Sequence, residues 1–129
     1  MRSRTRFNAP KKILGYRVAE KDIETIKAAA EAMEAEFIQL GDEASGQIVG
    51  YLAGFNGFKE NTEPSPEVPD KECLIFSGFD SKTLDKLLDR FDESGYSTDL
   101  MCVITSENQK IPLYQLIKNL WAEHLSMSK

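Results

Sequence analysis

The stretch CLIFSGFDSKTLDKLL, from Cys73 to Leu88, is almost continuously apolar up to Ser77-Gly78, and its apolar residues then recur at helical spacing. A continuous apolar run is typical of a strand in a sheet that is covered on both faces. The inward positions of the helix that follows are Leu84, Leu87, Leu88 and Phe91. A strand that passes through a glycine turn directly into an amphipathic helix indicates an α/β fold.

The rest of the second half continues this alternation. Residues 100–105 (LMCVIT) form another apolar run, and Pro112 suits the first position of a helix. One face of that helix comprises Leu113, Leu116, Ile117, Leu120 and His124. We therefore expect the order strand, helix, strand, helix after Cys73.

The first half shows the same order less clearly. Residues 11–17 and 36–41 are strand candidates, and residues 20–36 between them carry apolar side chains at helical spacing. Residues 45–55 also keep helical spacing, but each glycine weakens a helix by about 1 kcal/mol, so this segment is ambiguous.

Some positions of the two halves correspond. Gly15-Tyr16 and Gly78-Phe79 each close the first strand of their half, and Tyr51 and Tyr114 lie at the same separation along the chain. Internal duplication is one hypothesis. The other is that any two βαβα units look alike, because glycine after a strand is ordinary turn chemistry.

Residues 56–71 (NGFKENTEPSPEVPDK) contain three prolines and few apolar residues, a composition that favours an exposed, extended linker. The predicted organisation is a basic flexible tail over residues 1–10, a βαβα half over 11–55, this linker, and a second βαβα half over 72–129. Such alternation implies parallel pairing through right-handed crossovers. We therefore expect an α/β fold with a four-stranded, mainly parallel sheet.

Charge and targeting signals restrict the partners and the compartment. The net charge of −5 argues against nucleic acid as the main partner, because phosphate backbones are bound by clustered Lys and Arg. The one basic cluster, from Arg2 to Lys12, is interpreted as a solubilising tail, with a nucleic-acid accessory role as the alternative. No apolar stretch is long enough to cross a bilayer or to form a secretory signal core, so we expect a cytoplasmic protein without a membrane partner.

Cys73 and Cys102 lie beside or inside predicted strands. In a cytoplasmic protein they are expected to be reduced and buried. Together with His124 they form no zinc-ligand spacing, so the sequence predicts neither a metal site nor a cofactor.

Three short motifs follow one another in the second half: Gly78-Phe79 before an acidic-capped helix, Thr105-x-x-Asn108-x-x-Ile111 after a strand, and Glu123-His124 late in the last helix. In this order and spacing, the chain from Cys73 to about Leu125 resembles a bacterial family described only as a domain of unknown function, number 3783. The family usually has tryptophan where this chain has Ile111. The resemblance supports the domain boundary and implies no activity.

Ser77 lacks the surroundings of a catalytic serine. The nucleophile of an α/β-hydrolase needs glycine two residues to either side, and those positions hold Ile75 and Phe79. Phe79 would also crowd a phosphate, and Asp80 would place a negative charge where an anion should bind. A turn at Gly78 and a helix cap at Asp80 or the following serine are therefore preferred over a catalytic or phosphate site.

The loop from Thr105 to Lys110 is the more interesting binding candidate, because it follows a buried strand at its carboxyl end, where open α/β sheets present ligands. One hypothesis is that Thr105 and Asn108, with Ser77, Gly78 and Asp80, line a small polar pocket. The other hypothesis is that Asn108 hydrogen-bonds its own turn.

The last helix carries two further candidates. His124 is expected to be a partly buried histidine that is hydrogen-bonded to backbone, with a ligand or proton-shuttle role as the alternative. Tyr114, Trp121 and Leu125 widen the apolar face, which makes them either core or an interface, since Trp and Tyr are enriched at interface hot spots.

These observations predict a non-catalytic binding or regulatory module that associates with itself or with a protein partner. The alternative is a small nucleotide- or metabolite-binding protein, or an enzyme, that uses the loops after the third and fourth strands. Neither hypothesis identifies a ligand.

Overall fold

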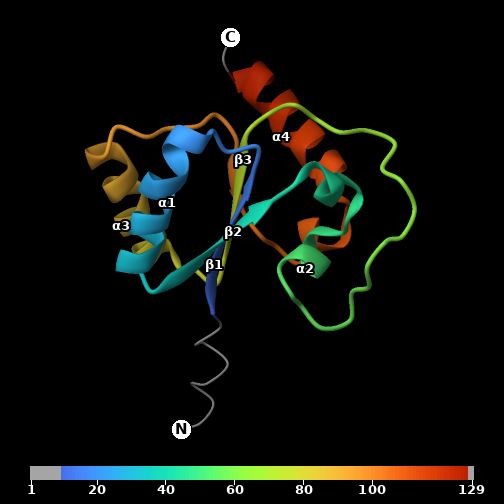
Figure 1. Cartoon of the computed structure of the whole chain (residues 1–129), viewed down its shortest axis with the longest axis horizontal. Helices are drawn as coiled ribbons and strands as arrows, with labels where there is room; N and C mark the ends of the chain where they lie inside the picture. The colour runs from blue at the N-terminus through green and yellow to red at the C-terminus, as the bar shows by residue number, and fades with distance from the viewer. Residues whose placement is uncertain (1–9, 128–129) are drawn as a thin grey trace, which may run out of the picture.

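A computed structural model describes residues 10–127 and has three layers, in which a sheet lies between two layers of helices (Figure 1). The strands are β1 (Lys11–Tyr16), β2 (Ala35–Leu40), β3 (Cys73–Ser77) and β4 (Met101–Val103). The helices are α1 (Glu20–Ala32), α2 (Val49–Leu52), α3 (Ser81–Glu93) and α4 (Leu113–Met127), with 3-10 turns η2 (Asp42–Gly46) and η3 (Asn108–Lys110). The predicted α/β class is confirmed.

The four strands form one sheet in the order β2-β1-β3-β4. Within each half the two strands are parallel, and the halves join through antiparallel pairing of β1 with β3. Leu14 lies opposite Ile75 at the centre of this junction. The prediction of a four-stranded, mainly parallel sheet is therefore confirmed, with one antiparallel junction.

Helices cover both faces of the sheet. Figure 1 shows α1 and α3 on one face, and α2 and α4 on the other. On the first face Ile13, Leu74 and Phe76 pack with residues of α1 and α3, and on the second face Leu14 and Ile75 pack with residues of α2 and α4. All five residues of β3 are buried, as its continuous apolar sequence predicts.

The two halves correspond in structure, but not at the positions that the sequence favoured. The residue that follows the first strand with positive φ is Arg17 (φ 56°) in one half and Gly78 (φ 83°) in the other. After the first helix, Glu34 (φ 58°) corresponds in the same way to Gly95 (φ 77°). Gly15 lies inside β1, so its alignment with Gly78 is wrong, and internal duplication stays a hypothesis.

Element boundaries differ most in the first half. Helix α1 ends at Ala32 rather than near residue 36, because Glu34 turns the chain in the left-handed conformation before β2 begins. The ambiguous segment 45–55 contains the end of η2 and the single-turn helix α2. Residues 53–72 contain no helix or strand, and this long segment runs on the α2 and α4 side of the sheet (Figure 1).

The predicted basic tail over residues 1–10 lies almost wholly outside the described residues, which begin at Pro10. Within residues 10–127, none of the helices has the length and apolar character that crossing a membrane requires.

Candidate functional site

The antiparallel junction separates the strand ends into two groups. The carboxyl ends of β1 and β2 lie at one end of the sheet, and those of β3 and β4 lie at the opposite end. Loops that follow parallel strands are where α/β sheets usually bind ligands. The molecule therefore has two separate candidate regions, one for each half.

The loop after β3 is a tightly packed turn. Gly78 has φ 83°, and a Cβ atom there would lie 2.4 Å from the carbonyl oxygen of Pro10. Asp80 is the N-cap of α3: its Oδ1 accepts hydrogen bonds from the backbone N–H of Thr83 at 2.8 Å and from the hydroxyl of Thr83 at 2.9 Å. These bonds hold the pKa of Asp80 below its ordinary value. Cap formation by Asp80 is thus confirmed.

Ser77, at the end of β3, is 6% exposed. It lines a cavity of about 400 Å³ together with Lys12, the chain around Gly54, and Asn56. Lys12 crosses this region and donates a hydrogen bond from Nζ to the carbonyl oxygen of Ala53 at 2.7 Å. The ammonium group of Lys12 is therefore bound to a backbone carbonyl group.

The loop after β4 is held by its own side chains. Thr105 N–H donates to Asn108 Oδ1 at 2.8 Å, and Asn108 N–H donates to Thr105 Oγ1 at 3.0 Å. The remaining amide group of Asn108 donates from Nδ2 to the carbonyl oxygen of Val103 at 3.1 Å. Each polar side-chain atom of Asn108 is used within its own turn, which favours the turn interpretation over a pocket.

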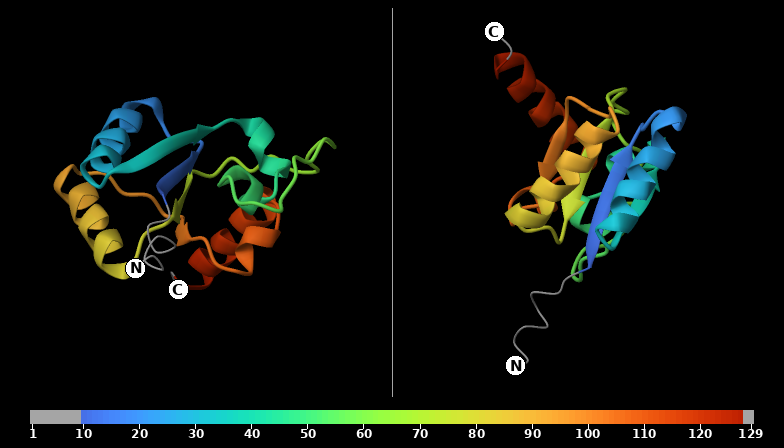
Figure 2. Two further views of the ribbon diagram at one scale, coloured as in Figure 1. Left: turned by 90° about the horizontal axis from the view of Figure 1, so that it is seen from below. Right: turned by 90° about the vertical axis from the view of Figure 1, so that its left-hand side faces the viewer.

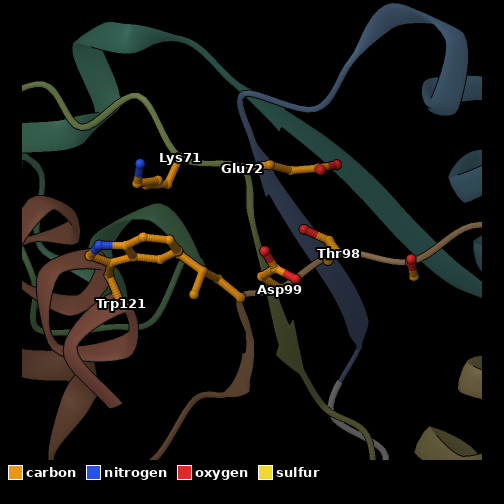
Figure 3. Close-up of a pocket in the computed structure, with 7 residues that line it drawn as sticks. Lys71, Glu72, Thr98, Asp99 and Trp121 are labelled. Carbon is orange, nitrogen blue, oxygen red and sulfur yellow. The ribbon is translucent and has the colours of Figure 1, made fainter. Parts of the chain in front are cut away.

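The opposite region contains a cavity of about 230 Å³ (Figure 3). It lies where the linker enters β3, beside the loop that leads into β4 and the last helix. Its lining residues are Lys71, Glu72, Ser97, Thr98, Asp99, Leu100 and Trp121. Figure 3 shows Lys71 next to the indole ring of Trp121, while the carboxylate of Glu72 extends away from that ring.

Lys71 and His124 both contact the ring of Trp121. Lys71 Nζ lies 4.4 Å from the centroid of the indole ring, a cation–π geometry. The His124 ring stacks on Trp121 with 5.3 Å between centroids and 25° between planes, and its Nε2 lies 3.8 Å from Asp99 Oδ2. The histidine is partly buried, as expected, but it faces a carboxylate and an aromatic ring rather than backbone.

Tyr96 binds one of the lining residues, Glu72. Its hydroxyl donates to Glu72 Oε2 at 2.7 Å. Burial and the Glu72 carboxylate raise the pKa of Tyr96, so the phenol stays protonated. The cavity thus combines one ammonium group, carboxylates and an aromatic face, groups that suit a small charged ligand or a charged segment of a partner.

The outer face of α4 remains exposed towards its end. Tyr114 and Trp121 are partly buried, whereas Leu125 is 48% and Met127 84% exposed. Figure 2 shows the C-terminal end of α4 projecting beyond the body of the molecule. Of the three proposed interface residues, Tyr114 and Trp121 lie along the body and Leu125 lies on the projecting end.

Sequence reasoning missed Lys71, Glu72 and Asp99. They belong to the linker and to a loop, and only the folded topology brings them beside Trp121. The available signal is the polar sequence immediately before each strand of the second half, of which only Lys71 falls in the segment predicted to be a linker.

Both cysteines have raised pKa values. Cys73 is buried and Cys102 is partly buried, and both are free thiols. Burial raises the pKa of Cys73, and it raises the pKa of Cys102 to about 12, which leaves no thiolate near neutral pH. Among the residues that the structure describes, no three or more His, Cys, Asp and Glu side chains are grouped to hold a metal ion.

Comparison with known proteins gives one family. Residues 72–127 match the model of a domain of unknown function (DUF3783). The matched segment begins at Glu72, just before β3, and includes β3, α3, β4, η3 and all of α4, so it corresponds to the second βαβα half. No curated protein and no solved structure matches the chain. The resemblance noted from the sequence is confirmed over this segment, and the family description carries no activity.

Proposed function

We propose that the protein is a non-catalytic binding module that associates with a second copy of itself through the C-terminal part of α4. The observation that carries the proposal is the apolar surface at the end of this helix. Leu125, one turn after the partly buried Trp121 and therefore beside it, is 48% exposed, and Met127 at the end of the helix is 84% exposed. Exposed apolar side chains that cluster are characteristic of interaction sites.

A second copy suits this surface because it offers the same patch. In a twofold contact each molecule covers the other's Trp121 and Leu125, so one interface removes both sets from water. The loops after β3 and β4 support a non-catalytic role. The side-chain oxygen of Asp80 is hydrogen-bonded within a helix cap, and the side chain of Asn108 is hydrogen-bonded within its own turn.

Sedimentation velocity over a range of concentrations tests this proposal. We expect the average mass to rise above the monomer mass of 14.5 kDa as the concentration increases. The variant Leu125→Glu should remove the rise, because it places a charge in an apolar contact. Ala28→Glu, at an exposed position of α1 in the other helical layer, is the matched control. A strict monomer at high concentration would refute self-association.

The second candidate is a nucleotide- or metabolite-binding protein that uses Ser77, Gly78 and Asp80 with Thr105 and Asn108. Its support is the position of these loops at the carboxyl ends of β3 and β4. A thermal-shift screen against nucleotides and metabolites tests it, because a ligand that binds the folded state raises its stability. A shift that disappears in Ser77→Ala would favour this candidate.

A further inference from the structure

Ser77 and Lys12 lie side by side on one face of the sheet. They are directly opposite each other in the antiparallel pairing of β3 with β1, and the Cβ atoms of such a pair are about 5 Å apart on the same face. Leu14 and Ile75, two residues away on the same strands, pack with α2 and α4, so Ser77 and Lys12 project to that face as well. A hydroxyl group and an ammonium group thus meet at the lower end of the sheet in Figure 1, where β1 begins.

The hydroxyl group of Ser77 has no partner in the fold. The residue is 6% exposed, and within residues 10–127 its Oγ atom makes no hydrogen bond. In that part of the chain, Ser45 Oγ is the one unpartnered side-chain atom that is wholly sealed from solvent. Ser77 Oγ therefore opens onto the cavity of about 400 Å³ that the residue lines. A nearly buried polar group without a partner is unfavourable for the fold, and a ligand in the cavity would supply that partner.

The ammonium group of Lys12 also has unused donors. It has three N–H groups, and one of them donates to the carbonyl oxygen of Ala53 at 2.7 Å. Among the described residues no carboxylate forms an ion pair with it. Gly54 has φ 82°, and a Cβ atom there would lie 3.0 Å from Lys12 Nζ. The absence of a side chain at Gly54 therefore leaves space beside the ammonium group.

The described residues that line this cavity carry one positive charge and no negative charge. They are Pro10, Lys12, Ser77 and residues 53–56. Asn56 adds an exposed amide group, and the partly buried Phe55 adds an aromatic, apolar wall. Hydrogen-bond donors around a cation, next to apolar surface, suit the anionic end of a small organic molecule.

The acidic cap of α3 does not oppose an anion in this cavity. Asp80 begins α3, and Phe79 packs in the core that α1 and α3 share, on the opposite face of the sheet from Lys12 and Ser77. Both residues disfavour an anion at the start of α3, but neither lines this cavity. Thr105, in the loop after β4, does not line it either.

We propose that this cavity binds a small organic anion, whose carboxylate or phosphate group accepts hydrogen bonds from Lys12 Nζ and Ser77 Oγ while its apolar part lies against Phe55. Lysine binds such groups as a compact point charge, and Ser77 supplies a donor from a buried strand. The volume of about 400 Å³ is in the range of small-molecule sites. All of these groups belong to one molecule of the protein, so binding does not depend on self-association through α4.

NMR titration of the full chain tests the site. The probes are benzoate, phenyl phosphate and the uncharged benzamide, which share an aromatic ring and differ in the group offered to Lys12. We expect at least one of the two anions to shift the amide signals of Lys12, Asn56 and Ser77 saturably below about 10 mM, a concentration that nearly saturates a site with a Kd of about 1 mM. The anion that binds more tightly identifies the group as carboxylate or phosphate. Benzamide should bind roughly tenfold more weakly, because it lacks the charge.

Lys12→Met and Lys11→Met form a matched pair of variants. Both lysines are partly buried in β1, but successive side chains of a strand point to opposite faces, and only Lys12 lines the cavity. Lys12→Met should weaken binding of the anion roughly tenfold, and Lys11→Met should leave it unchanged. Ser77→Ala, which removes only a hydroxyl group, should weaken binding roughly fivefold and tests the site even if Lys12→Met does not fold.

Four results would overturn the proposal. The first is the absence of saturable shifts with both anions in the folded wild type, and the second is binding of benzamide as tightly as the anions. The third is equal weakening by Lys11→Met and Lys12→Met, which would reflect net charge rather than this cavity. The fourth is loss of binding in Thr105→Ala, which would place the ligand in the loops after β3 and β4. Leu125→Glu should leave anion binding unchanged, so this test and the test of self-association can fail independently.

Discussion

Gly78 and Gly95 share a backbone conformation but not their surroundings. Their φ angles are 83° and 77°, in the left-handed region, which costs a residue with a side chain about 1–2 kcal/mol. A Cβ atom at Gly95 would meet nothing within 4 Å, whereas at Gly78 it would lie 2.4 Å from the backbone oxygen of Pro10. A side chain at Gly95 would therefore cause conformational strain alone, whereas a side chain at Gly78 would cause both strain and steric overlap.

We expect Gly95→Ala to lower the free energy of unfolding by about 1 kcal/mol and Gly78→Ala to lower it clearly more. The difference arises because the oxygen of Pro10 belongs to backbone and cannot rotate away. Urea denaturation of both variants measures it. Equal losses would mean that the start of β1 moves aside without cost.

Because Asp80 is charged, we expect the stability of the fold to depend on pH. Its pKa in the folded state is lowered by the hydrogen bonds from Thr83. A carboxyl group of this kind stabilises the fold above its unfolded pKa of about 3.9, and the stabilisation is lost as the pH falls through the lower folded value. Asparagine also caps helices but does not titrate.

We therefore expect the wild type to lose stability relative to Asp80→Asn when the pH falls below about 4. Urea midpoints measured from pH 7 downwards test this. Parallel curves for the two proteins would contradict a role for the charge of Asp80.

At the scale of elements, the Asn108 side chain makes two of the hydrogen bonds that stabilise the turn after β4. Asn108 accepts from Thr105 N–H and donates to the carbonyl oxygen of Val103. Each such bond contributes about 1 kcal/mol. We expect Asn108→Ala to lose about 2 kcal/mol and to accelerate amide exchange at Thr105.

Asn108→Asp separates the two contacts. Aspartate keeps the oxygen that accepts from Thr105 and removes the amide that donates to Val103. Its second carboxylate oxygen faces the carbonyl oxygen of Val103 and costs stability, but exchange at Thr105 should stay slow because its N–H keeps its acceptor. Rapid exchange at Thr105 in both variants would assign the effect to the amide group instead.

How far the sequence predicts each element depends on whether the signal is local. Strand β3 and helix α3 follow from a continuous apolar run, a turn glycine and the cap at Asp80, all of which act within a few residues. The cavity beside Trp121 does not follow from local signals, because Lys71 comes from a linker and Asp99 from a loop. The end of α1 was also missed, since the left-handed turn falls on Glu34, a residue without turn preference.

At the scale of the whole molecule, the halves depend on each other. Of the four strands, the segment that matches DUF3783 contains only β3 and β4. Without β1, the backbone groups of β3 that now pair with it would lack partners, although every residue of β3 is buried. Buried unpaired backbone groups are costly, so the two halves should unfold as one cooperative unit.

Leu14→Ala tests this cooperativity from the first half. Leu14 is fully buried at the centre of the junction, opposite Ile75, and its truncation should cost about 2–5 kcal/mol. Trp121 is the only tryptophan and lies in the second half. We expect the urea midpoints from Trp121 fluorescence and from far-UV circular dichroism to coincide and to fall together, because β1 pairs directly with β3. If the fluorescence midpoint keeps its wild-type value while the dichroism curve splits into two steps, the halves fold independently and the antiparallel junction does not couple them.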